Sequence, residues 1–466
     1  MKKTVFALCF GNRGFMPGEL ILDARREMVQ AVRDAGYDCI LMDEGLTRFG
    51  AVETRDEGLL YAEWLKKHEG QYDGVIFSMP IFVDENGAAN ALQDAGVPIL
   101  MQAYPDEIGK MNFKYRRDAY CGKFSVTDVF CQYKIPFTVF KPHVVHPMAE
   151  AFAQNLHDFA AVCRVVKGMK RFNLGCIGAR TTAFKTVRID ELALQKHGIT
   201  METYDLSSVF AEAAAIKAND AALKAKAAKL RDYACWKGTP ARAFGHICRL
   251  GVVLDRLVET AGLDCLAIRC WVEMQQQLGI SPCVLLSEMN ERGIPTACEV
   301  DVGNAIMMRA LHLASGGAPT CLDWNNNYGD DPDKCILFHC GPVPASLMTA
   351  RGEIQDHAIL ANSVGKGKAF GCNTGRIAPN PFTFGSLLTR DGALCCYLGE
   401  GRFTDDPIPA DFFGCAGVAE IPNLQTSLQT IGYQGHRHHV SVAAGTFAAP
   451  VCEALTKYLG YAVTRL

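Results

Sequence analysis

The sequence has none of the short motifs that identify common nucleotide-binding, zinc-binding and hydrolytic proteins. No Gly-x-Gly-x-x-Gly follows the first apolar run and no Walker sequence occurs, so a nucleotide site is not implied. Cys-x-x-Cys, His-Glu-x-x-His and Gly-x-Ser-x-Gly are absent as well. Zinc ribbons, thioredoxin-like proteins, zinc proteases and α/β-hydrolases therefore have no support.

An excess of charge and a long apolar run are also missing. The 47 basic and 50 acidic residues give a net charge of −3, which argues against nucleic acid as a partner. No uncharged apolar stretch reaches the ~18 residues that a membrane span needs. The apolar run near the start is followed by Asn12 and Arg13 and not by a small-residue cleavage site, so we interpret it as a first β-strand. We expect no membrane association and a cytoplasmic location.

Cysteine is present, but not at the density of a disulfide scaffold. The 20 cysteines are spread over 466 residues, and many lie inside apolar runs, as Cys9 and Cys176 do. In such runs a cysteine acts as a small hydrophobic residue. This usage is typical of a reducing compartment.

Length and patterning predict an α/β protein with three domains. In residues 1–148, apolar runs of four to eight residues alternate with helical segments, which indicates a Rossmann-like domain with a doubly wound parallel sheet. Residues 149–345 repeat the alternation as a second α/β domain. In residues 346–466, Gly, Pro and Thr interrupt short β-like runs, which predicts a mainly antiparallel β-rich domain.

Three acidic residues lie close to expected strand ends in the second region. Glu299 and Asp301 lie at the end of one strand candidate and precede a helix, and Asp323 ends the next strand candidate. The carboxyl ends of strands in α/β sheets are where ligands bind. An acidic residue there can equally be the N-cap of the next element, and we favour that role for Asp301. For Glu299 and Asp323, the pattern is equally compatible with a ligand-binding role and with an N-cap role.

Histidines in the last third of the chain add to this pattern. His339 closes an apolar strand, and strand alternation sends His438 and His439 to opposite faces. Two carboxylates with one or two imidazoles suit Mn²⁺, Mg²⁺ or Fe²⁺ better than structural zinc. Arg13 follows the first strand, so its side chain is expected at the edge of the sheet where ligands bind. An ordinary surface arginine is the equally open alternative.

These residues resemble the L-fucose isomerase/L-arabinose isomerase superfamily, and the fucose isomerase side more closely. The stretch CEVDVGNAIMMRALHLASGGAPTCLDWNNN, residues 298–327, is similar to the family's E-N-D…N-G-V-A-M…F-A-D unit, with Val300 in place of its asparagine. The segment GYQGHRHHVSVAAG is similar to the family's N-H-G…G strand. The order of these parts fits along the whole chain, while specific motifs cover about a fifth of it.

The resemblance implies a metal-dependent aldose–ketose isomerase that acts on an open-chain sugar through an enediol. The substrate would be of the L-fucose/D-arabinose or L-arabinose type. By the same resemblance, Glu299 and Asp323 are metal ligands and the catalytic proton carriers, and His439 is the third ligand, with His438 as the alternative. The metal is expected to be Mn²⁺, with Mg²⁺ or Co²⁺ possible.

The resemblance also assigns residues to the sugar and implies an assembly. Arg13 matches an arginine that the family's N-terminal domain places at the sugar. His339 matches a metal ligand on the arabinose isomerase side only, so we place it with His438 among the substrate-binding residues. Family members form homohexamers whose active sites lie at subunit interfaces.

Two other functions remain compatible with the residues. His339, His439 and one acid could form a metal site for hydrolysis or oxygen chemistry. The βα texture of the first half also permits a sugar-binding regulator without catalysis.

Overall fold

The structure is a computed structural model that describes residues 3–466. These residues form two compact units. The first comprises the described part of Met1–Lys167 with Glu453–Gly460, and the second comprises Gly168–Cys452 with Tyr461–Leu466.

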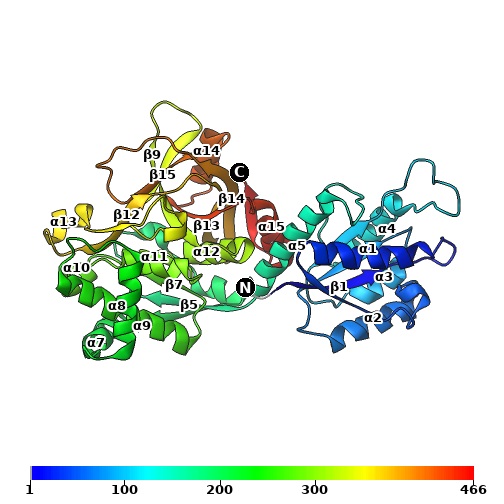
Figure 1. Cartoon of the computed structure of the whole chain (residues 1–466), viewed down its shortest axis with the longest axis horizontal. Coiled ribbons are helices and arrows are strands. Elements are labelled where there is room, and N and C mark those ends of the chain that lie inside the picture. The colour runs from blue at the N-terminus through cyan, green and yellow to red at the C-terminus, as the bar shows by residue number, and fades with distance from the viewer. Residues whose placement is uncertain (1–2) are drawn as a thin grey trace. The chain divides into compact units, whose positions relative to one another are not determined.

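The first unit is built on a four-stranded parallel sheet of order β2-β1-β3-β4. Buried apolar strands alternate with helices, and Figure 1 shows α1 and α2 on opposite sides of β1. Its elements are β1 (Val5–Phe10), α1 (Leu20–Asp34), β2 (Asp38–Leu41), α2 (Arg55–Lys67), β3 (Gly74–Met79), α3 (Glu85–Leu92), β4 (Ile99–Ala103), α4 (Ala119–Gln132) and α5 (Glu150–Met169), with short helices at Arg48–Gly50 and Ala454–Tyr458.

The second unit begins with another parallel sheet, of order β6-β5-β7-β8. Its apolar face packs against the long amphipathic helix α9 and its neighbours. The elements are β5 (Phe172–Ile177), α6 (Glu191–Lys196), β6 (Ile199–Tyr204), α7 (Leu206–Ala215), α8 (Ala221–Tyr233), α9 (Ala241–Ala261), β7 (Cys265–Ile268), α10 (Glu273–Leu278), α11 (Cys283–Glu291), β8 (Thr296–Cys298) and α12 (Val302–Ser315), with a short helix at Lys185–Val187.

The rest of the second unit is a nine-stranded sheet of order β11-β12-β15-β10-β9-β16-β13-β14-β17. A further pairing of β15 with β14 closes the antiparallel strands between them into a barrel, whose interior is filled by aromatic and aliphatic side chains. The elements are β9 (Pro319–Asn327), β10 (Lys334–His339), β11 (Glu353–Asp356), α13 (Ala358–Val364), β12 (Phe370–Arg376), β13 (Pro381–Arg390), β14 (Ala393–Phe403), β15 (Cys415–Glu420), α14 (Leu424–Tyr433), β16 (His439–Ala444), α15 (Ala448–Glu453) and β17 (Ala462–Arg465), with a short helix at Ala345–Leu347.

The predicted fold class is confirmed, because two parallel α/β sheets precede a mainly antiparallel barrel. One detail differs from the expected βα series. Strands β9 and β10, expected to continue that series, pair antiparallel with each other inside the barrel. Their other partners, β16 and β15, come from near the end of the chain, and a local pattern does not reveal such pairings.

Two negative observations apply to the described residues. None of their helices combines the length and the hydropathy that a bilayer-spanning segment requires. No disulfide joins any of the cysteines in residues 3–466.

Candidate metal centre

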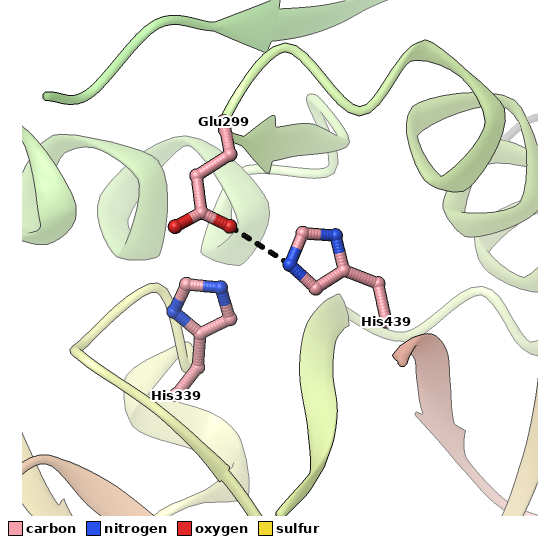
Figure 2. Close-up of side chains that lie close together, drawn as sticks. All are labelled: Glu299, His339 and His439. Atoms are coloured by element: carbon pink, nitrogen blue, oxygen red, sulfur yellow. Dashed lines mark ion pairs between the residues drawn. The ribbon is translucent and has the colours of Figure 1, made fainter. Parts of the chain in front are cut away.

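Glu299 occupies a strained turn between β8 and α12. Both Glu299 (φ 61°) and Val300 (φ 59°) adopt the left-handed conformation, which costs non-glycine residues about 1–2 kcal/mol each. Val300 is β-branched, so the strain at that position is genuine. Such strain persists where the surroundings hold it, and it is concentrated at functional sites. From this turn the Glu299 side chain reaches two imidazoles of the barrel (Figure 2).

Asp323 and His439 reach the same place because of strand register. They are direct cross-strand partners on β9 and β16. The neighbouring pair, Leu322 and Val440, belongs to the barrel core, so alternation turns Asp323 and His439 to the other face of the barrel wall. The His439 Nε2 atom lies 3.4 Å from Asp323 Oδ1. The prediction that Asp323 ends its strand is wrong, because β9 continues to Asn327 and Asp323 lies in its interior.

His339 ends β10, the strand beside β9, and its ring lies 5.8 Å from that of His439. The backbone N–H of Cys340 donates to His339 Nδ1 at 2.9 Å. Because Nδ1 accepts this hydrogen bond, the neutral ring carries its proton on Nε2. His339 therefore presents an N–H donor, and this Nε2 is buried without a hydrogen-bond partner among the described residues.

His439 has the opposite tautomer. It is fully buried, and its Nδ1 lies 2.8 Å from Asp301 Oδ2. Because a carboxylate only accepts, Nδ1 carries a proton and donates to it. His439 Nε2 lies 2.8 Å from Glu299 Oε2. In the neutral ring, Nε2 therefore carries a lone pair that is directed at the carboxylate of Glu299.

The ionisation of this pair is strongly coupled. Burial opposes the charged form of Glu299, but the hydrogen bond with His439 and its positive charge lower the pKa of Glu299 to about 2. Burial likewise opposes protonation of His439, but its bonds to Asp301 and Glu299 raise its pKa to about 10. A proton or another cation is thus strongly favoured between Glu299 and His439.

The donor set fits a divalent cation. One oxygen or nitrogen atom from each of Glu299, His339 and His439 lies within 4.8 Å of the others, and the same holds for Asp323, His438 and His439. The proton on Nε2 makes neutral His339 a hydrogen-bond donor beside the ion and not a ligand. His439 is common to both groups, whereas His438 is 43% exposed and its Nε2 lies 3.7 Å from Asp323 Oδ1. Oxygen and imidazole donors suit Mn²⁺, Mg²⁺ or Co²⁺. Such an ion would satisfy Asp323 Oδ1, which is buried without a hydrogen-bond partner among the described residues, and the unprotonated His439 Nε2, which otherwise faces carboxylate oxygens.

Asp301 is an N-cap, as the sequence suggests, but it has a larger role than a cap. Its side chain accepts from the backbone N–H of Asn304 at 3.0 Å and begins α12. The same carboxylate also bonds His439 and the buried Arg437. Arg437 was not among the predicted site residues, although alternation through GHRHHV places it on the same face as His439.

Aromatic residues beside the cluster were also not anticipated. Trp271 Nε1 donates to Glu299 Oε1 at 3.0 Å and so fixes the carboxylate from the side away from His439. The ring of Phe184 lies 5.9 Å from that of Trp271, 5.5 Å from that of His438 and 5.7 Å from that of His439. Phe184 lies in the connection between β5 and α6, more than 80 residues before Trp271 in the sequence, so no local pattern connects it with the cluster.

Arg13 belongs to the first unit, so the cluster is formed without it. Its guanidinium donates to Val83 O at 3.1 Å, pairs with Glu85 and lies 4.4 Å from the ring centre of Phe82. These contacts hold it directly after β1, where the sequence placed it.

Comparisons with known proteins find family matches in both the N-terminal and the C-terminal parts of the chain. Residues 7–170 match the family model of the fucose/sulfoquinovose isomerase N-terminal domain, and residues 337–466 match that of the L-fucose isomerase C-terminal domain. A sulfoquinovose isomerase of Priestia aryabhattai is 22% identical over 390 residues, which are 80% of this chain and 81% of the relative. Another, of Clostridium sp. (strain MSTE9), is 25% identical over 56% of this chain and 58% of the relative.

Proposed function

Because this chain belongs to the fucose isomerase-like superfamily and is a sugar aldose–ketose isomerase, we propose that it works with a divalent cation on an open-chain sugar. Glu299, Asp323 and His439 hold the ion, with Mn²⁺ the first candidate and Mg²⁺ or Co²⁺ the alternatives. The ion would stabilise negative charge that develops on O1 and O2 of the sugar as protons move.

One observation carries the metal proposal. The Nδ1–H group of His439 donates a hydrogen bond to Asp301, and the Nε2 atom points at a Glu299 oxygen 2.8 Å away. Two lone pairs at this distance repel each other unless a cation lies between them. In the apoprotein, a proton on His439 Nε2 removes this repulsion. In the working enzyme, the metal takes the place of that proton.

The two carboxylates divide the proton transfer. One of Glu299 and Asp323 removes the proton at C2 and returns it at C1 of the enediol, while the other moves the hydroxyl proton. Trp271 keeps Glu299 aimed at the cluster. His339, with its proton on Nε2, donates a hydrogen bond to a sugar oxygen and is not a metal ligand.

The sugar is proposed as a class. The family resemblance favours L-fucose, D-arabinose or L-arabinose, and the relatives named as sulfoquinovose isomerases add a 6-sulfonated hexose. The assay therefore uses these four sugars.

The test begins with apoenzyme prepared by exhaustive EDTA dialysis. Each sugar is added in D₂O with and without Mn²⁺, Co²⁺ or Mg²⁺, and ketose and deuterium at the transferred position are followed by NMR. We expect ketose from at least one sugar, no turnover in the apoenzyme, and recovery with added metal. An enzyme that is fully active after dialysis, with no metal by elemental analysis, contradicts the metal proposal.

The same assay separates the other functions. Tight metal binding without turnover of any aldose would favour a metal enzyme of another class, a hydrolase or an oxygenase. Sugar binding that needs no metal and leads to no product would favour a regulator.

Assembly and location complete the proposal. We expect a homohexamer in which Arg13 of one subunit contacts the sugar at a neighbour's metal site. We also expect the enzyme to act in the cytoplasm, which cell fractionation would test, and the absence of disulfides among residues 3–466 supports a reducing compartment.

A further inference from the structure

We propose that Asp301, supported by Arg437, is the positioning residue of this site and holds His439 in the tautomer that can bind a metal. The inference rests on the proposed function, since it concerns the metal that His439 binds. It assigns a role to a buried carboxylate that is neither a ligand nor a proton carrier.

The carboxylate of Asp301 is saturated by donors. Its Oδ1 accepts from the backbone N–H of Asn304 at 3.0 Å and from Arg437 Nη1. Its Oδ2 accepts from Asn304 Nδ2 at 2.7 Å and from His439 Nδ1 at 2.8 Å. A carboxylate offers about four lone-pair positions, and here all are used. Asp301 therefore cannot bind the metal or take the substrate's proton.

What Asp301 can do is fix the imidazole. A neutral histidine has one N–H nitrogen and one nitrogen with a lone pair. The group that accepts the hydrogen bond from the N–H fixes the tautomer, and the other nitrogen can then bind a metal. Because Asp301 accepts at Nδ1, the lone pair of His439 lies on Nε2, next to Glu299 and Asp323. Removing this acceptor frees the ring to adopt the other tautomer or to rotate.

Arg437 makes an ionised Asp301 possible at a fully buried position. The Asp301 side chain has no exposed surface and that of Arg437 is 2% exposed, so each compensates the other's charge away from water. Asn304 is held in turn, because its Nδ2 also donates to Ser386 Oγ and its Oδ1 accepts from Ser441 Oγ. The network links the start of α12 to β13 and β16, the strand of His439.

The first test is Asp301→Asn. The amide must place its NH₂ group toward His439, because Arg437 has no acceptor to offer it. The NH₂ group then donates to Nδ1, which moves the ring proton to Nε2 and blocks the metal. We expect the Kd for Mn²⁺, measured on apoprotein by EPR of free Mn²⁺, to rise roughly 10- to 100-fold.

The matched control is Asp220→Asn. Asp220 caps α8 by accepting from the backbone N–H of Ala222 at 2.8 Å and of Leu223 at 3.2 Å, and it also pairs with Arg256. Like Asp301, Asp220 caps a helix and pairs with an arginine, but it does not contact a histidine. Its substitution is expected to lower the melting temperature and to leave the Mn²⁺ Kd unchanged.

The outcomes are distinct. Asp301→Asn with a lower melting temperature and a wild-type Mn²⁺ Kd would mean that Asp301 is only a cap, which overturns the inference and leaves the proposed function intact. Wild-type protein that binds neither Mn²⁺ nor Co²⁺ overturns both.

If Asp301→Asn does not melt cooperatively, Arg437→Gln and Arg437→Lys replace it. Gln removes the cation that holds Asp301, so the Mn²⁺ Kd should rise, and Lys should restore most of the affinity. Equal, wild-type affinity in both variants overturns the inference.

Discussion

At the scale of single residues, the site depends on which group holds each proton. Glu299 and Asp323 are the two carboxylates with an oxygen directed at His439 Nε2, while the oxygens of Asp301 are fully used. The two imidazoles differ in the same way: His439 offers a lone pair and His339 offers an N–H. These assignments follow from hydrogen-bond partners, and each can be tested by one substitution.

The carboxylates are tested by Glu299→Gln and Asp323→Asn. Each change removes both a metal ligand and a proton carrier, so kcat for the sugar found in the assay should fall by a factor on the order of 10³ or more, with the fold retained. Glu420→Gln is the control, because Glu420 pairs with Arg402 at the other end of the β10–β15 pairing from His339. Circular dichroism checks the fold, and activity near wild type in either site variant contradicts the assignment.

His339 is tested by comparing His339→Gln with His339→Ala. Gln keeps an N–H donor at similar reach, whereas Ala removes it. We expect Ala to lower kcat by roughly 10²-fold, Gln to lower it less, and both to keep the Mn²⁺ affinity of the wild type. A Kd for Mn²⁺ that rises more than tenfold in both variants would identify His339 as a metal ligand.

At the scale of elements, the site depends on how closely the start of α12 approaches the barrel. A Cβ atom on Gly303 would lie 2.1 Å from the carbonyl oxygen of Leu387 on β13 and 2.9 Å from Arg437 Nη1. Only glycine allows this packing. The contact brings the N-cap of α12, Asp301, within hydrogen-bond distance of the first residue of β16, His439.

We therefore predict that Gly303→Ala lowers the free energy of unfolding by roughly 1–3 kcal/mol, because backbone must move, and weakens Mn²⁺ binding by displacing Arg437. Gly432→Ala is the matched control. Gly432 is an exposed residue of α14 whose added Cβ would meet nothing within 4 Å, so alanine should raise the free energy of unfolding by roughly 0.5–1 kcal/mol. Urea titration measures both, and a stabilised Gly303→Ala would refute the close approach.

At the scale of the whole molecule, the proposed function requires the sugar to contact residues of both units. The candidate metal cluster lies in the second unit and Arg13 in the first. The proposed hexamer supplies Arg13 from a neighbouring subunit.

A mixing experiment tests that assembly. Arg13→Ala lacks the sugar contact and Glu299→Gln lacks the metal chemistry, so each should be nearly inactive alone. Co-expressed with different tags, they should form mixed oligomers in which some sites combine an intact Arg13 with an intact Glu299, and a sizeable fraction of activity should return. Mixed oligomers, shown by tandem pull-down, that stay as inactive as either parent would mean that Arg13 serves its own subunit's site or none.

The sequence by itself determined the features that depend on near neighbours along the chain. Apolar runs separated by helical segments indicated the parallel sheets, and the acidic residue before a helix indicated the cap at Asp301. Both follow from backbone periodicity or from capping within a few residues. For Glu299 and Asp323 the pattern allowed a site or a cap equally, and the family resemblance favoured the site.

Only the tertiary structure decided that Asp323 faces His439, that β9 and β10 belong to the barrel, and that Asp301 holds a histidine. Pairing register between distant strands depends on which faces can be buried together, and a shift by one residue would turn His439 into the barrel core. The tautomers of His439 and His339 depend in turn on partners that this register brings into contact. A sequence can supply the donors and acceptors of such a site, but the packing of the strands decides which of them meet.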